Sequence, residues 1–156
     1  MRREGTAELS DEAKRAAVET MYADYKRSFL EVPDITPDRL AAMQAEGNVV
    51  IVDVREPEEQ SVSIIPGAVS KEAFEQEIER YRDSTIVAHC TVGYRSGKYA
   101  RKLRKKGLEV FNLKGSILAW VHAGNELVDA DGRKTRKVHV YDEEWNLLPE
   151  GYEALW

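Results

Sequence analysis

The stretch that decides the fold runs Thr85-Ile86-Val87-Ala88-His89-Cys90-Thr91-Val92-Gly93-Tyr94-Arg95-Ser96. Its first residues, Thr85 to Ala88, are apolar or β-branched, and this pattern predicts a strand buried on both faces, as in parallel sheets. A loop with a central glycine follows, and then a helix that begins near Ser96. Sites in open α/β sheets gather at the carboxyl ends of strands. Cys90 therefore lies where chemistry is expected.

Strands and helices alternate on either side of this stretch. Val49-Val50-Ile51-Val52 predicts a second buried strand that ends at Asp53, and residues 108–113 predict a third. Helices are expected over residues 36–47, 70–81, 96–106 and 116–123. The alternation predicts an α/β fold with a mainly parallel central sheet flanked by helices.

Both ends of the chain depart from this alternation. Residues 9–30 carry apolar side chains every fourth position, which predicts a helix stopped by Pro33 whose apolar stripe packs on the domain. Near the other end, Asp131-Gly132 predicts a hairpin between Glu126-Leu127-Val128 and Val138-His139-Val140-Tyr141. We expect three parts, which are a helical extension over residues 1–33, a core domain over 34–124, and a C-terminal hairpin and tail over 125–156 packed on that domain.

Composition and net charge limit the classes of function that this protein can have. Of 156 residues, 42% are hydrophobic and 33% charged, as in an ordinary soluble globular protein. The 23 basic and 28 acidic residues give a net charge of −5, which argues against a nucleic-acid partner. The chain has no apolar run of the roughly 18 residues that a membrane span requires. Met1-Arg2-Arg3 is followed by polar residues, so we expect no export signal and a cytoplasmic protein.

Cys90 is the single cysteine, which excludes a disulfide within the chain, and a structural zinc site would need other ligands. Backbone N–H groups of the following loop and of the helix N-terminus can converge on one anion. A thiol at that point ionises more readily than a free one. Gly93 permits the turn that such a cradle needs. The alternative is an inert core cysteine.

Four segments resemble the motifs of the rhodanese family. Cys90 to Ser96 resembles its active-site loop C-x-x-G-x-R-S, and Asp53-Val54-Arg55-Glu56 resembles D-V-R-E after the first core strand. Ile65-Pro66-Gly67-Ala68 resembles the I-P-G-A turn, and Leu113 to Trp120 the closing L-x-G-G-x-x-x-W. The departures are Ser63-Ile64, where the family often has Gly-His, and Ser116 in place of the second closing glycine. We expect both departures to affect the scaffold rather than the chemistry.

This resemblance implies a rhodanese-like three-layer fold and a sulfurtransferase. Cys90 would carry a persulfide, taking sulfur from a small donor such as thiosulfate or a persulfide and passing it to a thiol or protein acceptor. Arg95 would meet the donor's anionic oxygens, and Asp53 and Arg55 would support the wall of the site. The loop that holds the persulfide would comprise Thr91, Val92, Gly93, Tyr94, Arg95 and Ser96. No cofactor, metal or membrane partner is expected.

Two alternatives stay open. Phosphatases and arsenate reductases related to the rhodaneses use the loop H-C-x-x-x-x-x-R, and His89 precedes Cys90 here. However, four residues rather than five separate Cys90 from Arg95, which favours sulfur over the larger phosphate. The second alternative is a non-catalytic binding or regulatory module, although inactive domains usually lack the cysteine.

Overall fold

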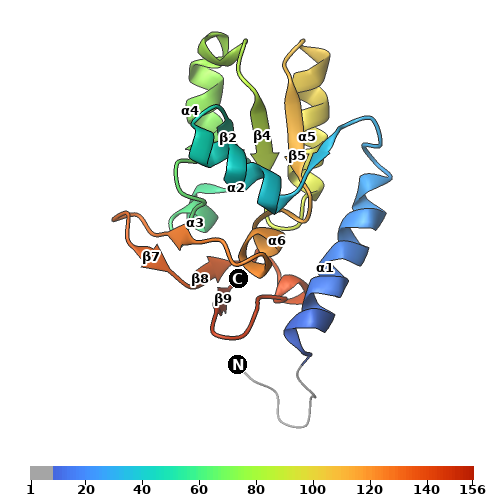
Figure 1. The fold of residues 1–156 in the computed structure, drawn as a ribbon, viewed down its shortest axis with the longest axis vertical. Coiled ribbons are helices and arrows are strands. Elements are labelled where there is room, and N and C mark those ends of the chain that lie inside the picture. The colour runs from blue at the N-terminus through green and yellow to red at the C-terminus, as the bar shows by residue number, and fades with distance from the viewer. Residues whose placement is uncertain (1–8) are drawn as a thin grey trace.

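The computed structural model describes residues 9–156, so Met1–Arg3 lie outside the described part (Figure 1). A parallel five-stranded sheet has the order β1-β5-β4-β2-β3. Its strands are β1 (Asp34–Ile35), β2 (Val50–Asp53), β3 (Val69–Ser70), β4 (Ile86–His89) and β5 (Val110–Leu113). The predicted mainly parallel sheet is confirmed, and the two short outer strands β1 and β3 extend it.

Helices cover both faces of this sheet. They are α1 (Asp11–Lys26), α2 (Pro37–Glu46), α3 (Pro57–Gln60), α4 (Lys71–Gln76), α5 (Tyr94–Lys105) and α6 (Ser116–His122). Ile51 and Val87 belong to one core cluster with residues of α2 and α6, whereas Val52, Ile86 and Ala88 pack with residues of α4 and α5. Neighbouring strand residues point to opposite faces, so both faces are buried in a three-layer fold.

Helix α1 lies beside α6 and α5 (Figure 1). Ser10 caps it by accepting a hydrogen bond from the Ala13 backbone N–H. Val18 belongs to one core cluster and Tyr22 to the other, so α1 contributes to the core on both faces of the sheet. The helix ends at Lys26 rather than at Pro33, and Phe29 is buried from the segment that follows. Leu9, expected in the buried stripe, is 53% exposed.

The expected helix over residues 70–81 is two shorter pieces. Ser70 caps α4, and at Glu77 the backbone leaves the helical region before a single 3₁₀ turn at Ile78–Tyr81. Phe74 is buried, and the Tyr81 ring stacks on it with ring centroids 5.3 Å apart. The prediction of one continuous helix was therefore wrong.

The predicted C-terminal hairpin around Asp131-Gly132 is present, but its second strand was predicted wrongly. β6 (Leu127–Val128) pairs antiparallel with β7 (Lys134–Thr135), because the Asp129 carboxylate accepts hydrogen bonds from Asp131 and Arg133 and holds a tight turn. β8 (Lys137–His139) instead pairs in parallel with β9 (Glu153–Leu155), after a 3₁₀ turn at Glu143–Trp145. This extension lies beyond the carboxyl ends of the sheet strands (Figure 1).

Within residues 9–156, every helix falls short of the length and apolar character needed to cross a bilayer.

Candidate active site

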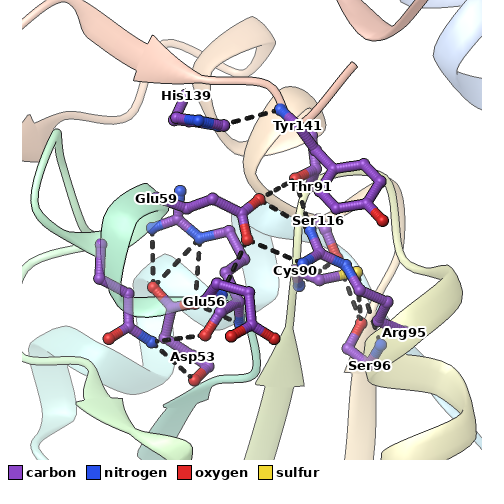
Figure 2. A network of polar contacts seen from close by, with 12 residues as sticks. Asp53, Glu56, Glu59, Cys90, Thr91, Arg95, Ser96, Ser116, His139 and Tyr141 are labelled. Carbon is purple, nitrogen blue, oxygen red and sulfur yellow. Dashed lines mark hydrogen bonds and ion pairs between the residues drawn. The ribbon is translucent and has the colours of Figure 1, made fainter. Parts of the chain in front are cut away.

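Cys90 directly follows β4 and is buried, with 1% of its surface exposed. The Ser96 hydroxyl oxygen lies 3.3 Å from its Sγ and the Ser96 backbone nitrogen 3.5 Å (Figure 2). Ser96 belongs to the first turn of α5, where backbone N–H groups have no acceptor within the helix. The first turn of this helix therefore offers the Ser96 N–H to the sulfur and places the Ser96 hydroxyl oxygen beside it.

The backbone of Cys90 is fixed by α6. The Cys90 N–H donates to the Ser116 hydroxyl over 3.1 Å, and the Cys90 and Thr91 carbonyls accept from the Ile117 and Leu118 amides, both over 3.2 Å. Ser116 has a left-handed φ of 47°, at the position where the rhodanese motif has glycine. The motif departure at Ser116 therefore adds a hydrogen bond at Cys90, which our expectation of a scaffold position did not anticipate.

The loop residues predicted from the sequence differ in their burial and in the contacts that they make. Thr91 and Val92 are buried, and Val92 joins the core cluster of α2 and α6. Gly93 has φ +125°, so the turn requires its conformational freedom. The Tyr94 ring packs edge-on against Tyr25 of α1, with ring centroids 5.1 Å apart.

Arg95 makes a bidentate ion pair with Glu59 of α3. Its terminal nitrogens lie 2.8 and 2.9 Å from the two carboxylate oxygens, and one of them is also 3.0 Å from the Thr91 hydroxyl. The Arg95 guanidinium is also 4.4 Å from the ring centre of Tyr141, in the C-terminal extension. Figure 2 shows Arg95 between Glu59 and Tyr141, close to Cys90. Nε of Arg95 is buried without a hydrogen-bond partner in the described residues.

The charges of this pair support each other. Burial alone would raise the pKa of Glu59, but the hydrogen bonds from Arg95 and from the Glu56 amide outweigh burial and hold the pKa below its usual value. Burial would likewise lower the pKa of Arg95, but its hydrogen bonds to Glu59 raise the pKa, and so does electrostatic attraction to the nearby Cys90 sulfur. Arg95 is therefore a permanent cation beside the sulfur, with most of its charge balanced by Glu59.

Asp53 and Arg55 form a second, deeper ion pair. Arg55 Nη2 lies 2.7 Å from Asp53 and 2.7 Å from the Ser63 carbonyl, and both side chains are almost completely buried. His89 Nε2 is 3.7 Å from Asp53, and burial lowers the pKa of His89, which keeps its ring neutral. In Figure 2 Asp53 lies on the side of Glu59 away from Cys90. The pair packs behind Glu59, which lies between it and the sulfur.

The sequence profile of the rhodanese-like domain matches residues 36–123. A tRNA sulfurtransferase of Desulfurococcus amylolyticus is 32% identical over 115 residues, covering 70% of this chain and 23% of that protein. A sulfurtransferase of Allochromatium vinosum is 33% identical over 89 residues, covering 54% of this chain and 83% of that protein. Among solved structures, a thiosulfate sulfurtransferase of Pseudomonas aeruginosa aligns with a TM-score of 0.56 at 21% identity, covering 80% of this chain and 24% of that one.

The fold, the Cys90 loop and the profile match define one class of protein. The chain belongs to the rhodanese-like domain family, a family of sulfurtransferase type. The match ends where the two extensions begin, so α1 and the segment after residue 123 lie outside the family profile.

Proposed function

We propose that this chain is a sulfurtransferase that carries a transferable sulfur atom on Cys90. The observation that carries the proposal is the position of the thiol: buried at the end of β4, with the Ser96 N–H and hydroxyl within 3.5 Å of Sγ. Hydrogen-bond donors at the start of a helix stabilise a sulfur anion. A cytoplasmic, reducing compartment suits a nucleophilic thiol of this kind.

The reaction consists of two displacements. The Cys90 thiolate attacks the outer sulfur of thiosulfate, the S–S bond of the donor breaks, and sulfite leaves with the electron pair. Cys90 then holds a persulfide anion. A thiol or cyanide acceptor attacks the terminal sulfur, the Cys90 S–S bond breaks, and its electrons return to Cys90 as a thiolate. The enzyme is restored without an external oxidant or reductant.

Arg95 serves the donor through its charge, and it is held in place because Glu59 and Thr91 accept hydrogen bonds from its terminal nitrogens. The anionic oxygens of thiosulfate would meet this charge, and a persulfide donor would depend on it less. Asp53 and Arg55 act one layer further out by fixing the backbone around β2 and Ser63.

Phosphoryl transfer is the less favoured reaction for the same loop. A phosphate needs several donors converging on its oxygens, with the loop arginine turned over them. In this structure both terminal nitrogens of Arg95 bind Glu59, and the Cys90 loop has four intervening residues. The structure therefore favours sulfur transfer.

The first prediction is that wild-type protein incubated with thiosulfate gains the mass of one sulfur atom. The variant Cys90→Ala should show no gain, because it has lost the only thiol of the chain. Intact-mass analysis measures the adduct, and thiocyanate formation from cyanide measures turnover. An unmodified wild type with both thiosulfate and a persulfide donor would favour the binding-module alternative.

The second prediction separates the two enzyme classes. Each phosphate oxygen left without a donor in a buried site costs about 1–3 kcal/mol, so two such losses would slow phosphoryl transfer by about two to four powers of ten. Hydrolysis of p-nitrophenyl phosphate and thiol-dependent arsenate reduction should both stay at the level of Cys90→Ala. Cys90-dependent phosphate release would reverse this assignment.

A further inference from the structure

A buried chain of hydrogen bonds connects helix α1 to the Cys90 sulfur. The Tyr22 hydroxyl donates to the Asp34 carboxylate, and Asn112 Nδ2 on β5 donates to the Tyr22 oxygen over 2.9 Å. The same Nδ2 donates to the Gly93 carbonyl over 3.0 Å. The Ser96 hydroxyl lies 2.7 Å from Asn112 Oδ1 and 3.3 Å from Cys90 Sγ. Tyr22 is therefore two side chains removed from the sulfur.

The direction of each hydrogen bond is determined. A carboxylate only accepts, so Tyr22 donates to Asp34. Burial and the neighbouring Asp34 raise the pKa of Tyr22 far above its usual value, and its hydroxyl stays protonated. Its oxygen then accepts from Asn112, so the amide NH₂ faces Tyr22 and Gly93 and the amide carbonyl faces Ser96. The orientation of Tyr22 thus fixes the acceptor that takes the single hydroxyl hydrogen of Ser96, and the Ser96 N–H is the donor toward Sγ.

The Tyr22 ring also supports the loop directly. A Cβ atom placed on Gly93 would lie 2.4 Å from the Tyr22 ring, so the loop backbone rests against that ring. Tyr22 is 1% exposed and cannot move aside without disturbing its core cluster. Tyr22 therefore holds both ends of the turn. It holds Gly93 through ring contact and through Asn112, and it holds Ser96 through Asn112.

We propose that Tyr22, outside the family profile, is a positioning residue for the chemistry of Cys90. This proposal rests on the proposed sulfur transfer. Without the Tyr22 oxygen, one buried Asn112 hydrogen loses its acceptor, and the amide is no longer held against Ser96 and Gly93. The Ser96 groups that face Sγ then lose their fixed position. Since Tyr22 is separated from the donor by the loop, the loss affects the chemical step and leaves donor binding unchanged.

The test compares Tyr22→Phe with the matched control Tyr99→Phe. Tyr99 is also buried and donates to a carboxylate, that of Glu75 over 2.9 Å, but it lies further along α5. In Tyr22→Phe we expect kcat for thiosulfate-to-cyanide transfer to fall about tenfold, with the donor KM within about twofold of wild type. Alkylation of Cys90 by iodoacetamide should slow severalfold. Both rates should stay within about twofold in Tyr99→Phe.

Equal rates in Tyr22→Phe and Tyr99→Phe would overturn the proposal. If Tyr22→Phe does not fold, Asp34→Asn is the second test of the proposal. An asparagine amide can donate a hydrogen bond to the Tyr22 oxygen instead of accepting one from its hydroxyl, and the partly exposed position tolerates the substitution. In Asp34→Asn, kcat and the alkylation rate should fall less than tenfold and should be lower than in Tyr99→Phe. Rates equal to those of wild type would contradict the positioning role of Tyr22. If wild type accepts no sulfur, the proposed function has failed, and the alkylation rates alone then decide the positioning role.

Discussion

Glu59 is the residue around which the site is organised. It lies on the short helix α3 and is 1% exposed, with its two oxygens on Arg95 and its Oε2 also accepting the Glu56 amide. A buried carboxylate is stable only when its charge and lone pairs are matched. Glu59 therefore links α3 to the first turn of α5 and fixes the distance between Arg95 and Cys90.

This environment makes the stability of the protein depend on pH. The pKa of Glu59 is lower in the folded state than its ordinary value of 4.5. Its contribution is fully present above that value and is lost as the pH falls through the folded pKa, because the unfolded chain takes up the proton first. Urea unfolding from about pH 6 down to about pH 3 should therefore cost wild type more stability than Glu59→Gln.

The control for this prediction is Glu58→Gln, which removes an exposed carboxylate from the same helix. Its loss of stability over the same pH range should match that of wild type. An equal loss in wild type and Glu59→Gln would show that Arg95 does not stabilise the ionised form.

Helix α5 packs tightly against the segment after α1 at Gly97. A Cβ atom on Gly97 would lie 2.2 Å from the ring of Phe29, which is completely buried. Alanine in place of glycine normally stabilises a helix by about 1 kcal/mol. Here we expect Gly97→Ala to destabilise the protein by about 1–3 kcal/mol, because the buried ring must shift.

Denaturant unfolding measures this effect, with Lys102→Ala, exposed on the same helix, as a near-neutral control. The double variant Phe29→Leu/Gly97→Ala should be less destabilised than the sum of its two single variants. Strict additivity would mean that the ring and the new methyl group do not meet.

At the scale of elements, local patterns predicted most of the core domain. Helix α2 is capped by Thr36, has Pro37 as its first residue and ends at Gly47, as these residue types predict. The β-branched runs became β2 and β4. The pairing of β8 with β9 is decided by contacts between distant residues, such as Val138 with Ala154, which no local pattern reports. Glu59 and Asn112 were missed for the same reason, since each becomes part of the site only when separate elements meet at Cys90.

At the scale of the molecule, the extensions share the core of the family domain. One cluster combines Val18 of α1 and Val138, Val140 and Trp145 of the C-terminal segment with residues of α2 and α6. Burial of apolar surface across these boundaries couples the parts in unfolding. We expect one cooperative transition rather than separate loss of the extensions.

The variant Trp120→Phe tests this coupling, because its remaining tryptophans, Trp145 and Trp156, both report on the C-terminal extension. The urea midpoint from their fluorescence should coincide with the midpoint from far-UV circular dichroism, which is dominated by the helices of the core. A fluorescence transition at clearly lower urea would show that the extension unfolds on its own.

The outer strands of the sheet have a consequence for the protein at high concentration. β1 and β3 each contain two residues, whereas the strands between them contain four. A long unpaired edge offers a template on which a strand from another molecule can add, and such growth leads to aggregation. Edges this short present too few free backbone groups for a second chain to align. The longest and most apolar strands are thereby confined to the interior, away from contact with other copies of the protein.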